Sequence, residues 1–463
     1  MNPTIFIILG VTGDLAQSKL LPALLSLYVK KQLPNTFSIV GFSRRHLSRE
    51  DFRAFVRETM DVEPGQYHEE EIKHFLDHVV YHEGNFEREE SYTALAARLK
   101  SIDDTFHQCS NKIFHLAVPP HFYETILDHL ANSGLTIPCG GDQGWTRVLV
   151  EKPFGSDIGT AKKLDKKLGD LFTEEQIFRI DHYLAKEALQ NIITFRFANA
   201  LFEPLWNAAY IDKVHIKLLE KEGIEGRGEF YDSIGALKDV GQNHILQILA
   251  IIAMKRPKSF TATDIRKERA QVLRALKGMS TKDVLKFGCR GQYDGYIGER
   301  GVSAVSQTET YFRLETYIAD SRWKDVPFYL ESGKCLAETK SEIDIYFKNT
   351  HAADFGNVAT LRRNVLTFRI QPDEGIKIRF LVKTPGFSME AVPKVLKFKY
   401  ADSPSIAILP DAYERVLYDA IVGDQTLFTS TDEVMAAWKF ITPISAALSS
   451  LPLTLYKKGA KEV

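Results

Sequence analysis

Residues 4–22 read TIFIILGVTGDLAQSKLLP, and this stretch decides the fold of the first part of the chain. Residues 4–9 form a short, nearly continuous apolar run, which is typical of a strand buried on both faces of a parallel sheet. Glycines 10 and 13 follow directly, and apolar residues then recur at helical spacing from Leu20. A strand, a glycine turn and a helix in this order indicate a doubly wound α/β domain.

The glycine turn is a candidate dinucleotide site. Glycine lets the backbone approach a pyrophosphate, and the following helix offers unpaired N–H groups at its start. The Gly-x-x-Gly spacing is shorter than the full Gly-x-Gly-x-x-Gly pattern, so a plain strand-to-helix turn is the alternative. The expected cofactor contacts in the turn are Gly10, Thr12, Gly13, Asp14 and Leu15. Pro22 is expected to kink or end the helix.

The end of the second expected strand, FSIVGFS at residues 37–43, indicates which cofactor binds. An NAD site usually carries an acidic residue there, to bind the ribose hydroxyls. This chain instead has Ser43, Arg44 and Arg45, and guanidinium groups suit a 2′-phosphate. NADP is therefore favoured over NAD, with an exposed basic turn as the alternative.

The remaining pattern predicts two domains. Apolar runs at 112–120 and 146–154 end in turn residues and alternate with helical stretches, whereas segments after about residue 195 alternate without helices between them. We expect an α/β doubly wound (Rossmann-like) domain over residues 1–175 and an α+β domain with a large, mostly antiparallel sheet over 176–463. Helices are expected in the second part at 233–254, 264–278, 411–422 and 432–448.

The composition is that of an ordinary globular protein, with 463 residues, 44% hydrophobic and 26% charged. Lys plus Arg is 59 and Asp plus Glu is 60, so neither nucleic acid nor a membrane surface is indicated as a partner. The four cysteines lie far apart and show no zinc spacing, which favours a reducing compartment. Together with the absence of a signal-peptide pattern, this predicts a cytoplasmic protein that needs no metal.

Two polar stretches on either side of the expected domain boundary are candidates for substrate contact. In RIDHYLAKE, residues 179–187, a helical reading places His182 and Lys186 on one side as paired cationic donors, with Asp181 about 100° round. In EKPFG, residues 151–155, Lys152 follows a strand at the edge where open parallel sheets bind ligands. Pro153 is a candidate for a cis peptide bond.

Two stretches of the second domain add further candidates. In GALKDVGQNHILQIL, residues 235–249, His244 lies at the polar edge of an apolar helix, where a satisfied core histidine is the alternative. A hydride-transfer enzyme needs a base near neutral pH, and Asp181 is a candidate carboxylate to orient that imidazole. In FYLESGK, Lys334 follows an apolar strand, with an ordinary loop lysine as the alternative.

These motifs together resemble a known family. GVTGDLAQSKLLP, IVGFSRR, EKPFG, RIDHYLAKE, GALKDVGQNH, SQTETYF and RWKDVPFYLESGK occur between residues 10 and 334 in the order found in the glucose-6-phosphate 1-dehydrogenase family. The resemblance implies oxidation of D-glucose 6-phosphate to 6-phospho-D-glucono-1,5-lactone with NADP, the first step of the oxidative pentose phosphate pathway. It also implies a homodimer or dimer of dimers, formed through the large sheet.

The resemblance also implies roles for individual residues. His244 is the implied base and Asp181 its orienting carboxylate. The implied ligands of the sugar phosphate are His182, Tyr183 and Lys186, with Lys152, Glu220, Asp239 and Lys334 contacting the rest of the sugar. Lys19 and Arg44 are implied cofactor contacts, and Lys152 is implied to lie between sugar and nicotinamide.

The chain departs from the family pattern at a few positions. Gln17 and Ser18 stand where the family usually has a basic residue, so only Lys19 is kept there. Thr339 stands where a further Lys or Arg is usual, and Lys340 beside it is the candidate replacement. The alternatives to the main reading are a sugar oxidoreductase that uses another hexose, another hexose phosphate or NAD, and a non-catalytic dinucleotide-sensing protein.

Overall fold

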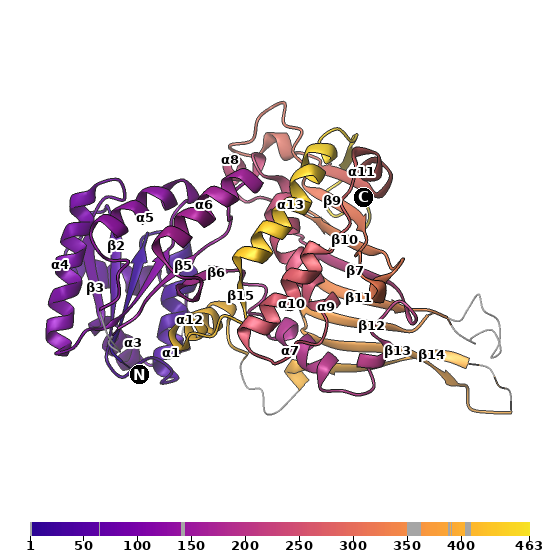
Figure 1. Ribbon diagram of the computed structural model, residues 1–463, viewed down its shortest axis with the longest axis horizontal. Helices are drawn as coiled ribbons and strands as arrows, with labels where there is room; N and C mark the ends of the chain where they lie inside the picture. Colours follow the sequence, from indigo (N-terminus) through magenta and orange to yellow (C-terminus); the bar gives the residue numbers. More distant parts are fainter. Residues whose placement is uncertain are drawn as a thin grey trace. The chain divides into compact units, whose positions relative to one another are not determined.

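A computed structural model of the chain describes residues 2–63, 65–139, 144–349, 363–387, 389, 391–402 and 409–463. The chain forms two compact units (Figure 1). The first comprises Met1–Gly155, Gly159–Ala185 and Pro410–Thr431, and the second comprises Ser156–Ile158, Lys186–Leu409 and Asp432–Val463. We expected one boundary after residue 175. In the structure the first unit runs on to Ala185 and takes in a late segment, because strands from both regions join its sheet.

The sheet of the first unit has the strand order of a dinucleotide-binding domain. Its described strands follow the order β15-β6-β5-β4-β1-β2-β3, and all neighbours are parallel except β15 beside β6. The strands are β1 (Thr4–Leu9), β2 (Phe37–Ser43), β3 (Val79–Glu83), β4 (Asn111–Leu116), β5 (Thr146–Val150), β6 (Ile177–Ile180) and β15 (Phe428–Thr429). Every residue of β1, β2 and β4 is buried, which confirms the interpretation of the apolar runs as central parallel strands.

Helices connect these strands. They are α1 (Leu21–Val29), α2 (Arg49–Thr59), α3 (Glu69–Asp77), α4 (Glu89–Phe106), α5 (Tyr123–Asn132), α6 (Ile158–Leu171) and α12 (Ala412–Val422). A π-helical segment, η1 (Ala16–Leu20), precedes α1. Ser48 begins α2 with a capping box, in which its hydroxyl accepts from the N–H of Asp51.

The second unit contains the large, mostly antiparallel sheet that we expected. Its described strands follow the order β14-β13-β12-β11-β7-β10-β9-β8-β16, and β7–β10 and β8–β16 are the parallel pairs. The strands are β7 (Ile211–Leu219), β8 (Gly288–Tyr293), β9 (Tyr311–Thr316), β10 (Phe328–Gly333), β11 (Lys340–Phe347), β12 (Val365–Gln371), β13 (Gly375–Lys383), β14 (Ala391–Lys399) and β16 (Leu453–Tyr456).

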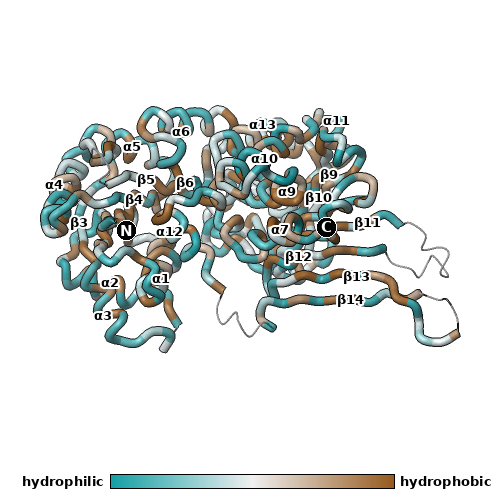
Figure 2. The backbone as a smooth tube through the Cα atoms, turned by 60° about the horizontal axis from the view of Figure 1, so that its bottom comes forward, coloured by the Kyte–Doolittle hydropathy of each residue, from teal (hydrophilic) through white to brown (hydrophobic). Residues whose placement is uncertain are grey.

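Helices of the second unit pack on one face of this sheet. Figure 2 shows α7, α9, α10 and α13 on the same side of the strands β11 to β14. The helical segments are α7 (Glu187–Phe197), α8 (Gly228–Asp232), the π-helical η5 (Leu237–Ile245), α9 (Leu246–Ala253), α10 (Ala262–Arg274), α11 (Thr281–Phe287) and α13 (Thr431–Leu448). Among the described helices, none combines the length and the apolar composition needed to cross a bilayer.

Helix α9 continues directly from η5 and anchors it in the core. All eight of its residues are buried, so its terminal carbonyl groups need partners inside the protein. Arg196 donates to the carbonyl oxygens of Ile251 and Met254 at 2.7 and 2.8 Å, and the indole N–H of Trp206 donates to Ile252 at 2.7 Å. These buried donors hold the helix end, and with it the segment that carries His244.

The cysteines include one pair that the sequence does not predict, and this disulfide departs from the reducing compartment that their spacing favoured. Cys109 and Cys139, 30 positions apart, form a disulfide in the first unit, while Cys289 and Cys335 are free. The ammonium of Lys112 lies 3.9 Å from each sulfur of the pair and 2.9 Å from a carboxylate oxygen of Asp103. The pairing depends on two loops that approach each other in the folded chain, and the spacing of the cysteines along the sequence does not predict this approach.

Candidate active site

Gly10 directly follows β1, the strand at which the strand order of the first sheet reverses. The neighbours of β1 are β2 and β4, so the chain after β1 stands at the crevice where open α/β sheets bind ligands. Gly10 has φ +92°, and a Cβ atom there would lie 2.3 Å from the carbonyl oxygen of Ala117, which follows β4. Glycine is therefore required at this position, both for the backbone conformation and for the close approach of the two strand ends.

The turn leads into an unusual helix start. The N–H of Gly13 donates to the Gly10 carbonyl at 2.9 Å, and the side-chain amide of Gln17 donates to the Thr12 carbonyl at 2.8 Å. Pro22 does not end the helix as expected: the π-helical η1 continues directly into α1, and Pro22 lies in the first turn of α1. π-Helical turns occur often at functional sites.

The end of β2 presents the basic residues expected beside the cofactor. Arg44 and Arg45 are exposed, and Ser43 is buried. The hydroxyl of Ser43 accepts from the N–H of Arg45 and from the hydroxyl of Thr12, both at 3.2 Å, which ties the arginine turn to the glycine turn. A glycine cradle joined to two exposed guanidinium groups fits a dinucleotide with an additional phosphate.

Lys152 lies in a bend shortly after β5. The Lys152–Pro153 peptide is cis, which confirms the expectation for Pro153. Glu151 beside it is buried, and its carboxylate bonds to the ring of His115 at 3.1 Å and to the hydroxyl of Tyr413 at 3.3 Å. Burial raises the pKa of Tyr413 well above its usual range, and the negative Glu151 adds to this effect. No sequence motif had marked Glu151 as the partner of His115 and Tyr413.

The helical interpretation of residues 181–186 is wrong. Strand β6 ends at Ile180, residues 182–185 form turns, and α7 begins only at Glu187 with Lys186 as its N-cap. The reason is local: the carboxylate of Asp181, 2% exposed, accepts from the N–H of Tyr183 at 3.0 Å, and its carbonyl accepts from Leu184 at 3.0 Å. This turn satisfies the backbone groups that a helix would have used.

Lys186 is the first residue of the long segment Lys186–Leu409 of the second unit. Its ammonium donates to the side-chain oxygen of Gln371 at 2.5 Å. Glu374 is a further charged neighbour. Burial raises the pKa of Glu374, and the positive charge of Lys186 opposes that rise. Lys186 is thus fixed at the start of α7 and beside the end of β12.

Asp239 and His244 lie together on η5. His244 is buried, with 2% exposure, and its N–H donates to the side-chain oxygen of Asn243 at 2.6 Å. The side-chain amide of Asn243 donates to the carbonyl of Asp239 at 2.9 Å. We expected one regular helix over 233–254; the structure has a π-helical segment followed by α9.

Glu220 and Lys334 form an ion pair between the ends of β7 and β10. These strands are parallel neighbours, so both residues emerge at the same edge of the sheet. Lys334 is buried, with 4% exposure, and its ammonium lies 5.4 Å from the ring of Tyr231. Burial raises the pKa of Tyr231, and the carboxylates of Asp239, Glu309 and Glu220 add to the rise. Tyr231 therefore joins this cluster, although no sequence motif had marked it.

Lys340 lies among carboxylates at the start of β11. Its ammonium is 2.7 Å from Glu342 and 3.4 Å from Glu338. The hydroxyl of Thr339 donates to Glu222 at 2.8 Å and accepts from the N–H of Lys221 at 3.1 Å. A phosphate at Lys340 would have to compete with two carboxylates.

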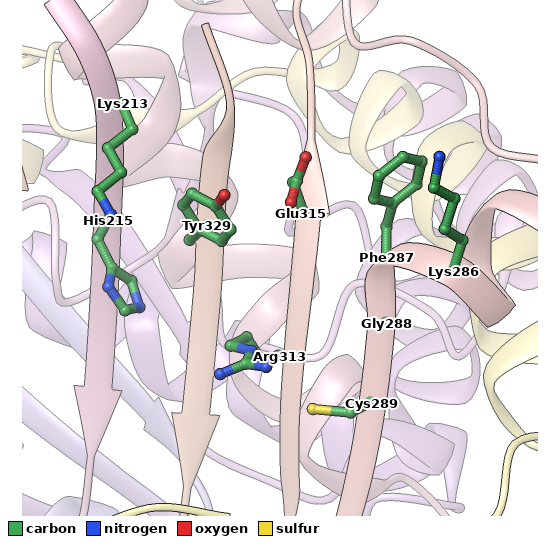
Figure 3. Close-up of a pocket in the computed structure, with 9 residues that line it drawn as sticks. All are labelled: Lys213, His215, Lys286, Phe287, Gly288, Cys289, Arg313, Glu315 and Tyr329. Carbon is green, nitrogen blue, oxygen red and sulfur yellow. The ribbon is translucent and has the colours of Figure 1, made fainter.

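A separate pocket of about 400 Å³ opens on strands β7 to β10. Figure 3 shows Lys213, Tyr329, Arg313 and Glu315 on neighbouring strands of its wall, with Lys286 beside it. Within the described part of the chain, none of the residues predicted to bind sugar or cofactor lines it. The pocket is therefore distinct from the candidate active site.

The doubly wound sheet, its glycine turn and the basic strand end define a dinucleotide-dependent oxidoreductase with a second, sheet-based domain. Two family models match the chain: "Glucose-6-phosphate dehydrogenase, NAD binding domain" over residues 7–191, and "Glucose-6-phosphate dehydrogenase, C-terminal domain" over residues 193–462. The chain belongs to the glucose-6-phosphate dehydrogenase family.

Relatives and a solved structure agree with this assignment. The glucose-6-phosphate 1-dehydrogenase of Aggregatibacter actinomycetemcomitans is 42% identical over 448 residues, which cover 95% of this chain and 89% of that protein. The enzyme of Bacillus subtilis is 38% identical over 453 residues, which cover 95% and 91%. A structure of glucose-6-phosphate dehydrogenase in complex with glucose-6-phosphate is 34% identical, with a TM-score of 0.91 and coverage of 99% and 95%.

Proposed function

We propose that this chain oxidises D-glucose 6-phosphate to 6-phospho-D-glucono-1,5-lactone with NADP, the first step of the oxidative pentose phosphate pathway. The observation that carries the proposal is that family membership extends over residues 7–191 and 193–462, while His244, Asp181, His182 and Lys186 are all present. A non-catalytic sensor on the same scaffold would be free to lose these residues.

His244 is the proposed base. It takes the proton of the anomeric hydroxyl as the hydride leaves the same carbon, and its burial limits competition from water for that proton. Asp181 is proposed to hold the imidazole in orientation and to stabilise its cation. NADP, when bound, supplies the hydride acceptor. The protein contributes alignment of the donor carbon and the exclusion of water.

The proposed sugar contacts divide by charge. His182, Tyr183 and Lys186 bind the phosphate, because a dianion is best met by several positive or hydrogen-bonding groups. Glu220 and Asp239 accept from sugar hydroxyls and Lys334 donates to them. Support for this set is the Glu220–Lys334 pair, which presents an acceptor and a donor side by side at one sheet edge. Lys152 is proposed to contact both the sugar and the nicotinamide.

The proposed cofactor contacts lie around the glycine turn. Gly10, Thr12, Gly13, Asp14 and Leu15 approach the pyrophosphate, Lys19 adds positive charge, and Arg44 binds the 2′-phosphate. Support for Arg44 is its exposed position directly after Ser43 at the end of β2, because the hydroxyl of Ser43 accepts from Thr12 of the glycine turn.

A homodimer or dimer of dimers that uses the large sheet is also proposed. Support comes from edge strand β14, where Val395, Leu396 and Phe398 are 47%, 61% and 44% exposed although they are apolar. Apolar side chains gathered on an edge strand favour contact with another chain. A cytoplasmic location is proposed as well, since phosphorylated sugar and NADP are metabolites of that compartment.

Initial rates of the purified chain with each pair of sugar and cofactor test the substrate and cofactor assignments. The sugars are glucose, glucose 6-phosphate and other hexose phosphates, each offered with NADP and with NAD. The expected result is the highest kcat/KM for glucose 6-phosphate with NADP. Preference for another hexose or for NAD would support a related sugar oxidoreductase instead, and no activity with any pair would support a sensing role.

A further inference from the structure

Glu309 touches the beginning of the helix that carries Asp239 and His244. It lies in the segment that leads into β9 and is partly buried. Its backbone carbonyl accepts from the N–H of Ala236 at 3.0 Å, and its carboxylate oxygen Oε1 accepts from the N–H of Leu237 at 3.2 Å. The first N–H groups of a helix have no partner within the helix, so Glu309 provides two acceptors from a distant part of the chain.

The helix start is shaped to receive this carboxylate. Gly235 has φ +73°, and a Cβ atom there would lie 2.5 Å from Oε1 and 2.7 Å from the carboxyl carbon of Glu309. Any other residue would push the carboxylate away from the helix. The absent side chain at Gly235 and the hydrogen bond to Leu237 therefore point independently to the same contact.

Burial of Glu309 is the largest influence on its charge, and neighbouring groups offset that influence in part. Burial raises the pKa of Glu309, while the N–H of Leu237 and the charges of Arg290 and Lys238 act in the opposite direction. A negative charge at a helix N-terminus is also favourable, because the helix dipole is positive there.

The residue after Glu309 holds the other proposed sugar-binding group. The carbonyl of Thr310 accepts from the N–H of Lys334 at 3.0 Å, and its hydroxyl bonds to that of Tyr456 at 2.9 Å. The hydroxyl of Tyr456 in turn donates to the carbonyl of Lys334 at 2.7 Å. Two consecutive residues thus connect the start of η5 with the strand end that carries Lys334.

We propose that Glu309 is a positioning residue, which fixes the start of η5 so that Asp239 and His244 keep a set distance from the Glu220–Lys334 pair. This inference rests on the proposed function. Glu309 is not among the proposed sugar contacts. It acts through the backbone of Ala236 and Leu237, and errors in its placement would be passed to the base and to the hydroxyl acceptors.

The test compares the variants Glu309→Ala and Glu309→Gln with the control Glu315→Ala. Glu315 is a carboxylate on the following strand β9, and it accepts from the hydroxyl of Tyr317. Glu309→Ala is expected to lower kcat/KM for glucose 6-phosphate at least tenfold, because a shift of about 1 Å at a reacting group can cost about a hundredfold. The KM for NADP is expected to stay within about twofold, because the turn that binds it belongs to the other unit. Glu309→Gln keeps an oxygen acceptor for Leu237 and is expected to recover most of the loss.

Hydrogen–deuterium exchange gives a readout that does not depend on activity. The amides of residues 236–245 are expected to exchange faster in Glu309→Ala than in wild type or in Glu315→Ala, with the other helices unchanged. Wild-type kinetics and exchange in Glu309→Ala would overturn the inference, as would equal losses in both Glu309 variants. If Glu309→Ala does not fold, Glu309→Asp replaces it, since it keeps the charge but shortens the reach. A wild-type chain inactive with glucose 6-phosphate would refute the proposed function. Hydrogen–deuterium exchange of residues 236–245 would then test by itself whether Glu309 fixes the start of η5.

Discussion

Asp239 and His244 lie five residues apart on one π-helical segment, and the side chain of Asn243 bonds to the backbone of both. In an α-helix of about 3.6 residues per turn, side chains five positions apart point about 140° away from each other. A helix with i→i+5 hydrogen bonds brings such positions toward one face. The π-helical segment therefore allows a proposed sugar-hydroxyl acceptor and the proposed base to serve one substrate.

Replacing His244 tests the base. His244→Asn is expected to lower kcat by at least a hundredfold while the KM for glucose 6-phosphate changes little, because general base catalysis contributes about 10² to 10⁴ in rate. The measurement is steady-state kinetics beside His215→Asn, since His215 pairs with Glu331 on β10 and has no proposed role. Near-normal turnover in His244→Asn would remove the base assignment.

Lys186 and Lys340 make a matched pair for the phosphate contact. Lys186→Ala is expected to raise the KM for glucose 6-phosphate at least tenfold, because a hydrogen bond to a charged group contributes about 1.5–3 kcal/mol. Lys340→Ala is expected to change this KM much less, because the ammonium of Lys340 is already paired with Glu342 and Glu338. A larger effect at Lys340 than at Lys186 would reverse the two assignments.

Arg44 is expected to set the cofactor preference. Arg44→Ala is expected to raise the KM for NADP at least tenfold while leaving the KM for NAD nearly unchanged, because only NADP carries the 2′-phosphate. Arg45→Ala is the matched control: its guanidinium lies 5.5 Å from the ring of Phe55 and is expected to matter less. Equal losses with both cofactors in Arg44→Ala would contradict a role at the 2′-phosphate.

The burial of Asp419 on α12 is expected to make the free energy of unfolding depend on pH. Burial raises the pKa of Asp419 to about 6, with Arg415 opposing. The folded state thus holds this proton more tightly than the unfolded chain, so stability is present at low pH and is lost as pH rises from about 4 to about 6. A rise of about two pKa units corresponds to at most about 3 kcal/mol.

Urea unfolding of wild type and Asp419→Asn across that pH range measures this loss. The wild type is expected to lose stability relative to the variant as pH rises, even though the variant lacks the two 2.9 Å contacts from Arg415 to ionised Asp419. Parallel curves for the two proteins would show that Asp419 titrates normally.

Periodicity predicted the elements whose residues share one environment. Strands β1 and β2 are mostly apolar and are buried throughout because both of their faces are covered, and helix α12 matches its predicted range except for its capping residue Asp411. The same reasoning failed at residues 181–186, where the carboxylate of Asp181 forms a turn that periodicity does not detect.

Features that depend on distant contacts were not predictable. The start of the π-helical η5 is held by Glu309, some seventy residues later in the chain. Lys340 pairs with Glu342, because side chains two positions apart lie on the same face of a strand. Tyr231 joins the Glu220–Lys334 pair through folding alone. Motif order supplied the candidate site residues, whose roles stay predictions, and the structure supplied their hydrogen-bond and ion-pair partners.

The central claim is that the chain transfers a hydride from glucose 6-phosphate to NADP with His244 as base. The most direct measurement is the absorbance of reduced nicotinamide after the purified chain is mixed with glucose 6-phosphate and NADP, with His244→Asn run in parallel. Rapid reduction by wild type and at least a hundredfold slower reduction by the variant are expected. No reduction by a folded wild-type chain, or equal rates for the two proteins, would contradict the claim.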